Sequence, residues 1–187
     1  MRWKAHATVP LVAGALGALL TYPPLLANGL AAQTPTAPLP RCHTSHLSVV
    51  FVDADAAAGH IADRFHLTNT SAAPCQLYGF VGAQMLDATG QPLPTQVRRN
   101  GGFFANQPGP ADVPLMPGQS AEFLMMWGDV PVGDESRCPA AAQVAITPPD
   151  ETSFLLLDLD QFALAPCNGG TIDVTPVGAV DAPKAGE

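Results

Sequence analysis

Charged and aromatic residues are scarce in this 187-residue chain, at 13% and 6% of the sequence. Basic residues are the scarcest charged group, because eight Lys and Arg stand against 16 Asp and Glu and leave a formal net charge of −8. Phosphate backbones and anionic lipid repel a chain of this sign, so no nucleic-acid partner is expected. Low charge combined with 20 prolines and 17 glycines also argues against a helical bundle.

Long hydrophobic runs are missing as well. The apolar run near the N-terminus covers residues 11–20, whereas a membrane-spanning helix needs about 20 apolar residues. Arg2 and Lys4 precede this run, and small residues at 27–32 follow it. The order is typical of a secretory signal peptide, which we place at 1–32. The mature chain is then expected to have no transmembrane segment and to be secreted or held in the cell envelope; retention of the segment as an anchor is the alternative.

The rest of the chain divides by composition into a Pro/Thr linker at 33–41, one domain at 42–177 and a small polar tail at 178–187 that is predicted to be disordered. Within the domain, apolar and polar residues alternate in short runs bounded by Gly, Pro, Asn and Asp, which is the pattern of β-strands. Strands are expected at 44–52, 60–69, 76–86, 120–127, 142–147, 153–159 and 172–174. Seven or eight short strands predict an all-β sandwich or barrel.

The domain contains four cysteines, Cys42, Cys75, Cys138 and Cys167. An even number in an exported chain indicates disulfides, and the lack of CxxC or CxH spacing argues against a zinc site. Four cysteines allow three pairings. The first two expected strands form a hairpin that returns the chain near Cys42 just before Cys75, and the fifth and sixth return it near Cys138 shortly before Cys167. We therefore favour Cys42–Cys75 and Cys138–Cys167.

A series of short motifs along the domain resembles a known family. In chain order the motifs are Ala58-Gly59-His60, Leu67-Thr68-Asn69-Thr70-Ser71, Pro74-Cys75-Gln76-Leu77 with Gly79, Leu86-Asp87 with Gly90, Leu115 with Pro117-Gly118-Gln119-Ser120-Ala121, Trp127, Cys138 and Cys167. The series is similar to a bacterial exported domain of unknown function that is common in actinobacterial secreted proteins and lipoproteins, and it covers about residues 41–177. The resemblance implies an immunoglobulin-like β-sandwich of about seven or eight strands. It implies no activity, and the lipid-acceptor cysteine of many members is missing here.

Four histidines, His43, His46, His60 and His66, are candidate metal ligands. Copper and zinc accept imidazole nitrogen, so a metal-binding protein is the alternative function. His60 and His66 share one face of an expected strand but lie about 20 Å apart along it. A shared ion would therefore need His43 or His46 from the paired strand. The simpler interpretation places these histidines on the surface and at a turn, and no cofactor is expected.

The region 98–114 is expected to be a long irregular loop. It contains the basic pair Arg98-Arg99 and the aromatic pair Phe103-Phe104. Arginine and aromatic side chains are common anchors of interfaces, and binding residues concentrate on loops. One hypothesis is that these four residues dock on an unknown protein or envelope component. In the alternative, the phenylalanines pack into the end of the sandwich and the arginines pair with acids.

Catalytic motifs are not evident, since the sequence lacks a GxSxG elbow and the pattern shows no activated nucleophile with a base. We therefore expect a non-catalytic binding or structural module rather than an enzyme.

Overall fold

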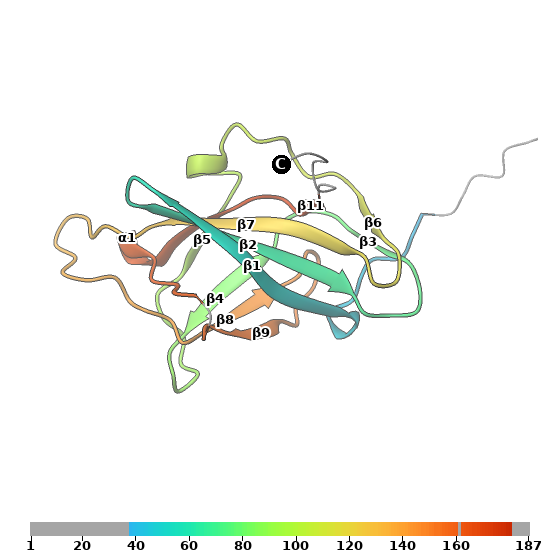
Figure 1. Ribbon diagram of the computed structural model, residues 1–187, viewed down its shortest axis with the longest axis horizontal. Coiled ribbons are helices and arrows are strands. Elements are labelled where there is room, and N and C mark those ends of the chain that lie inside the picture. The colour runs from blue at the N-terminus through green and yellow to red at the C-terminus, as the bar shows by residue number, and fades with distance from the viewer. Residues whose placement is uncertain (1–37, 161, 181–187) are drawn as a thin grey trace, which may run out of the picture. The chain divides into compact units, whose positions relative to one another are not determined.

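A computed structural model describes residues 38–160 and 162–180 (Figure 1). The predicted signal peptide and residues 33–37 of the predicted linker lie outside this described part, as do residues 181–187 of the predicted tail. Within the described part, no helix combines the length and the apolar character needed to cross a membrane.

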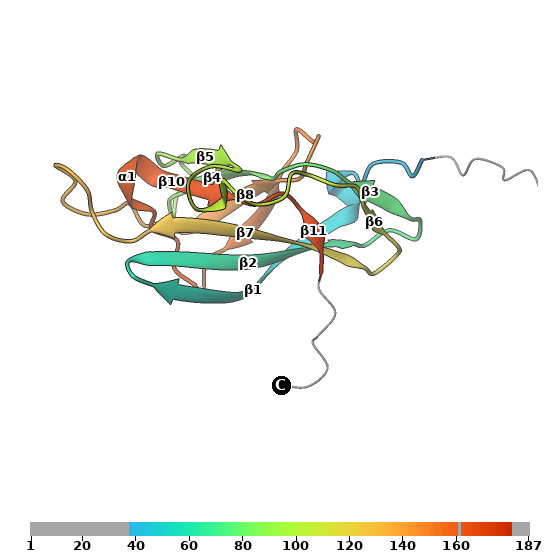
Figure 2. The same cartoon turned by 90° about the horizontal axis from the view of Figure 1, so that it is seen from above.

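The described chain is mostly β, with eleven strands in three sheets, one short α-helix, α1 (Cys167–Gly170), and two 3-10 turns, η1 (Thr44–His46) and η2 (Gly102–Phe104). In the largest sheet the neighbours are, in order, β1 (Leu47–Ala57), β2 (His60–Asn69), β7 (Ser120–Gly128), β10 (Thr171–Val174) and β5 (Gln96–Arg99), and β11 (Gly178–Ala179) pairs with β7. A second sheet contains β4 (Gly82–Leu86), β8 (Gln143–Thr147) and β9 (Leu155–Asp158), and a third contains β3 (Cys75–Leu77) and β6 (Val113–Leu115). Figure 2 shows β1, β2 and β7 running side by side, with β11 next to β7.

Strands β2 and β7 have one apolar face each. Phe65 and Leu67 of β2 and Phe123 and Met125 of β7 are buried, and the residues between them are more exposed. Successive side chains of a strand point to opposite faces. Because Phe65 is paired directly with Phe123, these apolar residues share one side of the sheet, as the period-two pattern predicts. We call this side the inner face and the opposite side the outer face.

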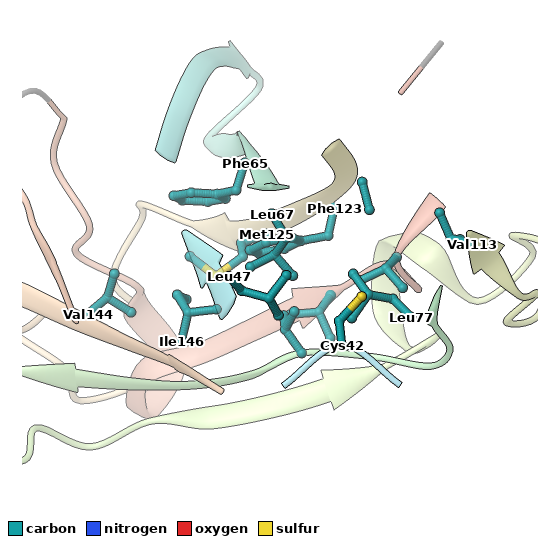
Figure 3. Close-up of a cluster of buried hydrophobic side chains, with 14 of the residues drawn as sticks. Cys42, Leu47, Phe65, Leu67, Leu77, Val113, Phe123, Met125, Val144 and Ile146 are labelled. Atoms are coloured by element: carbon teal, nitrogen blue, oxygen red, sulfur yellow. The ribbon is translucent and has the colours of Figure 1, made fainter. Parts of the chain in front are cut away.

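The inner face packs into a buried hydrophobic cluster that also takes in the second and third sheets. Figure 3 shows Phe65 and Phe123 of the largest sheet opposite Val144 and Ile146 of β8. The rings of Phe65 and Phe123 stack with their centroids 5.2 Å apart. Each fully buried side chain of this size contributes about 1.5–3 kcal/mol, so this cluster is the main source of stability.

The structure corrects three of the predicted boundaries. The strand expected at 76–86 is two strands, β3 and β4, in different sheets, because the chain turns at Gly79, whose φ of +113° favours glycine. The region 98–114, expected to be an irregular loop, begins in β5 and ends in β6. The first residues of the predicted tail form β11. These additional strands are short and their alternation is weak, which is why the sequence pattern does not reveal them. The described chain therefore has more strands than the seven or eight expected.

Two disulfides join the four cysteines, Cys42 to Cys75 and Cys138 to Cys167. These are the pairs that the order of the predicted strands favours. Cys42 and Cys75 belong to the core cluster, whereas Cys167 begins α1. Structural disulfides persist in oxidising compartments, and their presence suggests an extracytoplasmic protein.

A single carboxylate, that of Glu151, fixes the start of the domain. The backbone N–H and the hydroxyl of Thr44 donate to its Oε2 at 3.0 and 2.9 Å, and His43 Nδ1 and Arg41 Nε lie 3.0 and 3.4 Å from its Oε1. The hydrogen bonds from Thr44, together with His43 and Arg41, lower the pKa of Glu151 to about 2. The carboxylate therefore stays ionised well into the acid range.

Candidate functional site

The four predicted docking residues do not form one patch. Arg98 and Arg99 are consecutive in β5, so their side chains point to opposite sides of the strand. Arg99 lies beside a hollow that Tyr78 also lines. Phe104 is buried but is not a member of the core cluster, whereas Phe103 is 47% exposed. The sequence-level hypothesis of a single basic and aromatic patch therefore needs correction: Arg98 and Phe103 come together, and Arg99 belongs elsewhere.

The strand pairing places Arg98 on the outer face at one end of the largest sheet. Arg98 is paired with Asp173 of β10, and Asp173 is paired with Met126 of β7. In the adjoining strand, His60 is paired with Gly128, two residues beyond Met126. Directly paired residues point to the same side of a sheet. Side chains from four strands of the sheet therefore converge at this end.

Arg98 and Asp173 form the central ion pair of this region. Arg98 Nε donates to Asp173 Oδ1 at 2.6 Å, and Arg98 Nη2 donates to Asp173 Oδ2 at 2.7 Å. Asp173 is only 1% exposed, and the ion pair and its hydrogen bonds raise the pKa of Arg98 above its ordinary value. A bidentate pair of this kind fixes the plane of the guanidinium group as well as its position.

The turn η2 (Gly102–Phe104) closes over this ion pair. The backbone N–H of Phe103 donates to Asp173 Oδ2 at 3.4 Å. Gly102 has a φ of +53°, and a Cβ at this position would collide with the Asp173 carboxylate and with Arg98. Glycine is thus required both for the backbone angle and for the close approach. The segment carrying Phe103 is therefore held against β10 rather than free in solution.

Phe103 projects from this turn toward the tip of the β1–β2 hairpin. Its ring centroid lies 4.3 Å from that of His60, and the two ring planes are tilted by 59°. Figure 1 shows the yellow-green turn η2 at the same end of the molecule as this hairpin tip. Nδ1 of His60 is buried and has no hydrogen-bond partner within the described residues. Phe103 thus forms an exposed aromatic wall beside a histidine.

A cavity of about 420 Å³ lies at this end of the outer face. Phe103, His60 and Arg98 line it together with apolar side chains, among them Met126, Val130 and Val132. Its size falls in the range of small-molecule sites, which are mostly apolar with a few placed polar groups. We call it the outer-face cavity.

Several of these residues were not among the sequence-predicted site residues, notably Asp173, Trp127, Val130 and Val132. Asp173 carried no distinguishing signal, because an acid between the apolar residues Ile172 and Val174 is the ordinary alternation of a strand with one solvent-facing side. Its burial beneath η2 follows from the tertiary structure. The valines carried no signal either, because they belong to the irregular segment after β7.

The four candidate metal ligands are spread over different surroundings. His43 lies against Glu151, and Nε2 of His66 is 3.5 Å from Glu122 Oε2. His60 faces Phe103, and His46 is exposed. Among the described residues, no cluster of three ligand groups contains a histidine. The structure therefore offers the metal-binding alternative no three-ligand site built on these residues.

Glu135, Cys138 and Cys167 bring three ligand-type groups within 4.8 Å of one another. Both sulfurs are in the disulfide and supply no thiolate. The carboxylate of Glu135 accepts the backbone N–H groups of Asn168 and Gly169 at 2.9 and 3.4 Å. The Glu135 carboxylate therefore holds α1, which borders the outer-face cavity.

Comparison with known proteins identifies the family. Residues 42–178 match the family model of a domain of unknown function, DUF4232. The chain belongs to this family. The match spans all eleven strands except the last residue of β11, so the whole outer-face cavity is part of the DUF4232 domain. No curated protein and no solved structure matches the chain significantly.

A second buried acid of the DUF4232 domain, Asp63, lies on the inner face next to the cavity wall. It is 1% exposed, and its Oδ2 accepts a hydrogen bond from Nε1 of Trp127, a cavity-lining residue, at 2.9 Å. Its Oδ1 has no partner within the described residues. Burial raises the pKa of Asp63 from 3.8 to about 6, and the hydrogen bond from Trp127 offsets part of this increase.

Because the pKa of Asp63 is raised, we expect the DUF4232 domain to become more stable as the pH falls from about 7 to about 4. The folded chain binds this proton more tightly than the unfolded chain, so protonation favours folding. The free energy of unfolding should rise by up to about 3 kcal/mol over this range. Below about pH 4.5 the opposite effect begins, because Glu151 has a lowered pKa and its stabilisation is lost as the pH approaches 2. Urea titrations at pH 7, 5.5, 4 and 3 measure the resulting maximum.

The variant Asp63→Asn is the control for this prediction. Asparagine has nearly the same shape and still offers an oxygen to Trp127, but it does not titrate. The difference in stability between variant and wild type should therefore change with pH between 7 and 4. A difference that stays constant over this range would show that Asp63 is not the responsible group.

Proposed function

We propose that this chain is a non-catalytic, extracytoplasmic binding module of the immunoglobulin-like β-sandwich type, secreted or held in the cell envelope, and that the outer-face cavity is its binding site. The observation that carries the proposal is the position of Phe103. An aromatic side chain that is 47% exposed stands beside a cavity of about 420 Å³ on a turn held by hydrogen bonds.

The rigid support of Phe103 favours binding over a purely structural role. Arg98 fixes Asp173, Asp173 accepts the Phe103 N–H of η2, and Glu135 holds α1 on another part of the cavity rim. A site that is ordered before the ligand arrives loses less conformational entropy on binding. Exposure alone does not single out Phe103, since Phe154 is more exposed; its fixed position beside a cavity does, and this position favours a ligand.

The chemistry of the cavity lining argues for holding a ligand rather than transforming it. The hydroxyl of Thr171 donates to the carbonyl oxygen of Asn168 at 2.7 Å, and Asp173 is occupied by Arg98. A nucleophile needs an adjacent base, and a general base needs a free lone pair toward the substrate. Thr171 and Asp173 do not meet these conditions. His60 lines the cavity with a nitrogen that has no hydrogen-bond partner among the described residues. The lining that the structure describes offers it no free hydroxyl or thiol to activate, because Thr171 donates to Asn168 and Cys167 is in a disulfide.

A fragment screen by ligand-observed NMR tests this function. We expect the full chain to bind a set of small fragments, and Phe103→Ala to weaken them by about thirtyfold or more, as for an aromatic anchor worth about 2 kcal/mol. Because Phe103 is half exposed, the variant should melt within a few degrees of the wild type.

Phe154→Ala is the matched control for this screen, because Phe154 is also exposed, at 57%, and is not part of the cavity lining. It should bind the same fragments as the wild type. Fragments that bind equally well to Phe103→Ala, or an absence of binding fragments, would refute the proposed function.

A further inference from the structure

The polar groups of the outer-face cavity differ in whether they can still form hydrogen bonds. Asp173 is unavailable to a ligand, because it is only 1% exposed and its two oxygens already accept three hydrogen bonds, two from Arg98 and one from the Phe103 N–H. Its negative charge is balanced by the same arginine. The one acid in the lining is therefore unavailable for a cationic ligand.

Arg98, in contrast, retains an unused donor. Nε and Nη2 bind Asp173, while Nη1 makes no hydrogen bond within residues 38–160 and 162–180. The Arg98 side chain is 48% exposed, whereas that of Asp173 is 1% exposed. The guanidinium is planar, so fixing the edge formed by Nε and Nη2 also fixes the direction of the remaining N–H groups. The cavity thus contains a cationic donor whose orientation is set in advance.

The negative net charge of the chain favours cationic ligands, whereas the Arg98 donor favours anionic ones. The formal net charge of −8 attracts cations from a distance, but salt screens such long-range effects beyond about 8 Å. Inside the cavity, a charge-assisted hydrogen bond acts at about 3 Å and is about twice as strong as a neutral one. Because Asp173 balances the charge of Arg98, this directed hydrogen bond, rather than net local charge, favours an anionic group in the cavity.

The remaining walls favour a flat apolar body. Phe103 offers an exposed ring, and Met126, Val130 and Val132 add apolar surface. Aromatic molecules pack on such rings with offset or edge-to-face geometry, which contributes beyond the buried area. Met126 lies on the same face of the sheet as Arg98 by strand pairing. A molecule that touches Phe103 and Met126 can thus place one end on Arg98.

We propose that the outer-face cavity selects small, flat apolar molecules that carry one anionic group, with the apolar body against Phe103 and the anionic group on Nη1 of Arg98. This inference rests on the proposed binding function and adds the chemical class of the ligand.

Two dyes with the same aromatic body test the inference. The anionic dye is 1-anilinonaphthalene-8-sulfonate, and the uncharged one is N-phenyl-1-naphthylamine, which lacks only the sulfonate. The chain has two tryptophans, Trp3 and Trp127, so the full chain with Trp3→Phe leaves Trp127 of the cavity wall as the single tryptophan. Energy transfer from Trp127 to each dye then reports binding to the domain, and its loss in Phe103→Ala assigns the binding to this site. We expect the sulfonate dye to saturate at one site and to bind about tenfold or more tightly than the uncharged dye.

Three variants separate the contributions of Phe103 and Arg98 to the affinity for the two dyes. Phe103→Ala should weaken both dyes about tenfold or more, and Phe154→Ala should weaken neither. Arg98→Lys keeps a positive charge for Asp173 but loses the outward donor, so it should remove the preference for the sulfonate dye while the uncharged dye binds as before. Circular dichroism and the melting temperature verify that each variant is folded.

The outcomes distinguish the two proposals. Equal affinity for both dyes, with dependence on Phe103, would overturn the anionic ligand class and leave the binding function intact. A sulfonate preference that persists in a folded Arg98→Lys variant would also overturn it. Energy transfer that is the same in Phe103→Ala and wild type would refute the binding function as well.

Discussion

Replacing Arg98 with alanine should lower the free energy of unfolding at pH 7 by about 3 kcal/mol, because it leaves the Asp173 carboxylate buried without its ion-pair partner. Removing one member of a buried ion pair is far more costly than losing an exposed one, for which the effect is about 0–1 kcal/mol. The exposed half of the guanidinium places this value at the lower end of the range for buried pairs. Urea denaturation followed by circular dichroism measures it.

Arg99→Ala is the matched control for this experiment. Arg99 is the next residue of the same strand, it is exposed, and it forms no ion pair within the described residues. Its removal should change the stability by no more than about 0.5 kcal/mol. The double variant Arg98→Ala/Asp173→Ala should regain part of the loss, because no unpaired carboxylate remains. If Arg98→Ala lowers the free energy of unfolding no more than Arg99→Ala does, the ion pair with Asp173 does not stabilise the domain.

Removal of both disulfides should unfold the domain at 37 °C. The two bonds span sequence separations of 33 and 29 residues, and loops of this length correspond to about 3–4 kcal/mol each in the chain-entropy model. Their sum of about 7 kcal/mol is comparable to the whole stability of many domains, about 5–15 kcal/mol. Thermal melts with and without a reductant, compared with a chain in which all four cysteines are alanine, measure the effect.

Variants that each lack one of the two disulfides should differ in stability and in dye binding. Cys42→Ala/Cys75→Ala should be the more destabilised, because both sulfurs belong to the core cluster and their loss also leaves a cavity. Cys138→Ala/Cys167→Ala should instead impair dye binding while folding is kept, because Cys167 borders the outer-face cavity. Melts that a reductant does not change would contradict the stabilising role of both bonds.

The sequence by itself determined the β-rich character of the domain and favoured the cysteine pairs that the structure shows. In β2 the alternation is clear, since a polar residue separates Phe65 from Leu67, whereas residues 123–127 of β7 are all apolar and do not alternate. Such periodicity follows directly from strand geometry and needs no knowledge of the partner strand. The disulfide pairs followed from the same local information, because each hairpin brings the chain back near its own start.

Only the tertiary structure decided which of the candidate residues form a site. Arg98 and Arg99 are neighbours in sequence, but the geometry of β5 sends them to opposite sides. The partner that positions Arg98 is Asp173, 75 residues away, and it is reached through the parallel pairing of β5 with β10. Phe103 meets His60 because η2 folds onto β10 and β2 lies two strands further along the sheet. Local patterns report which way a side chain points, whereas the order and register of distant strands determine what it meets, and that order depends on packing of the whole chain.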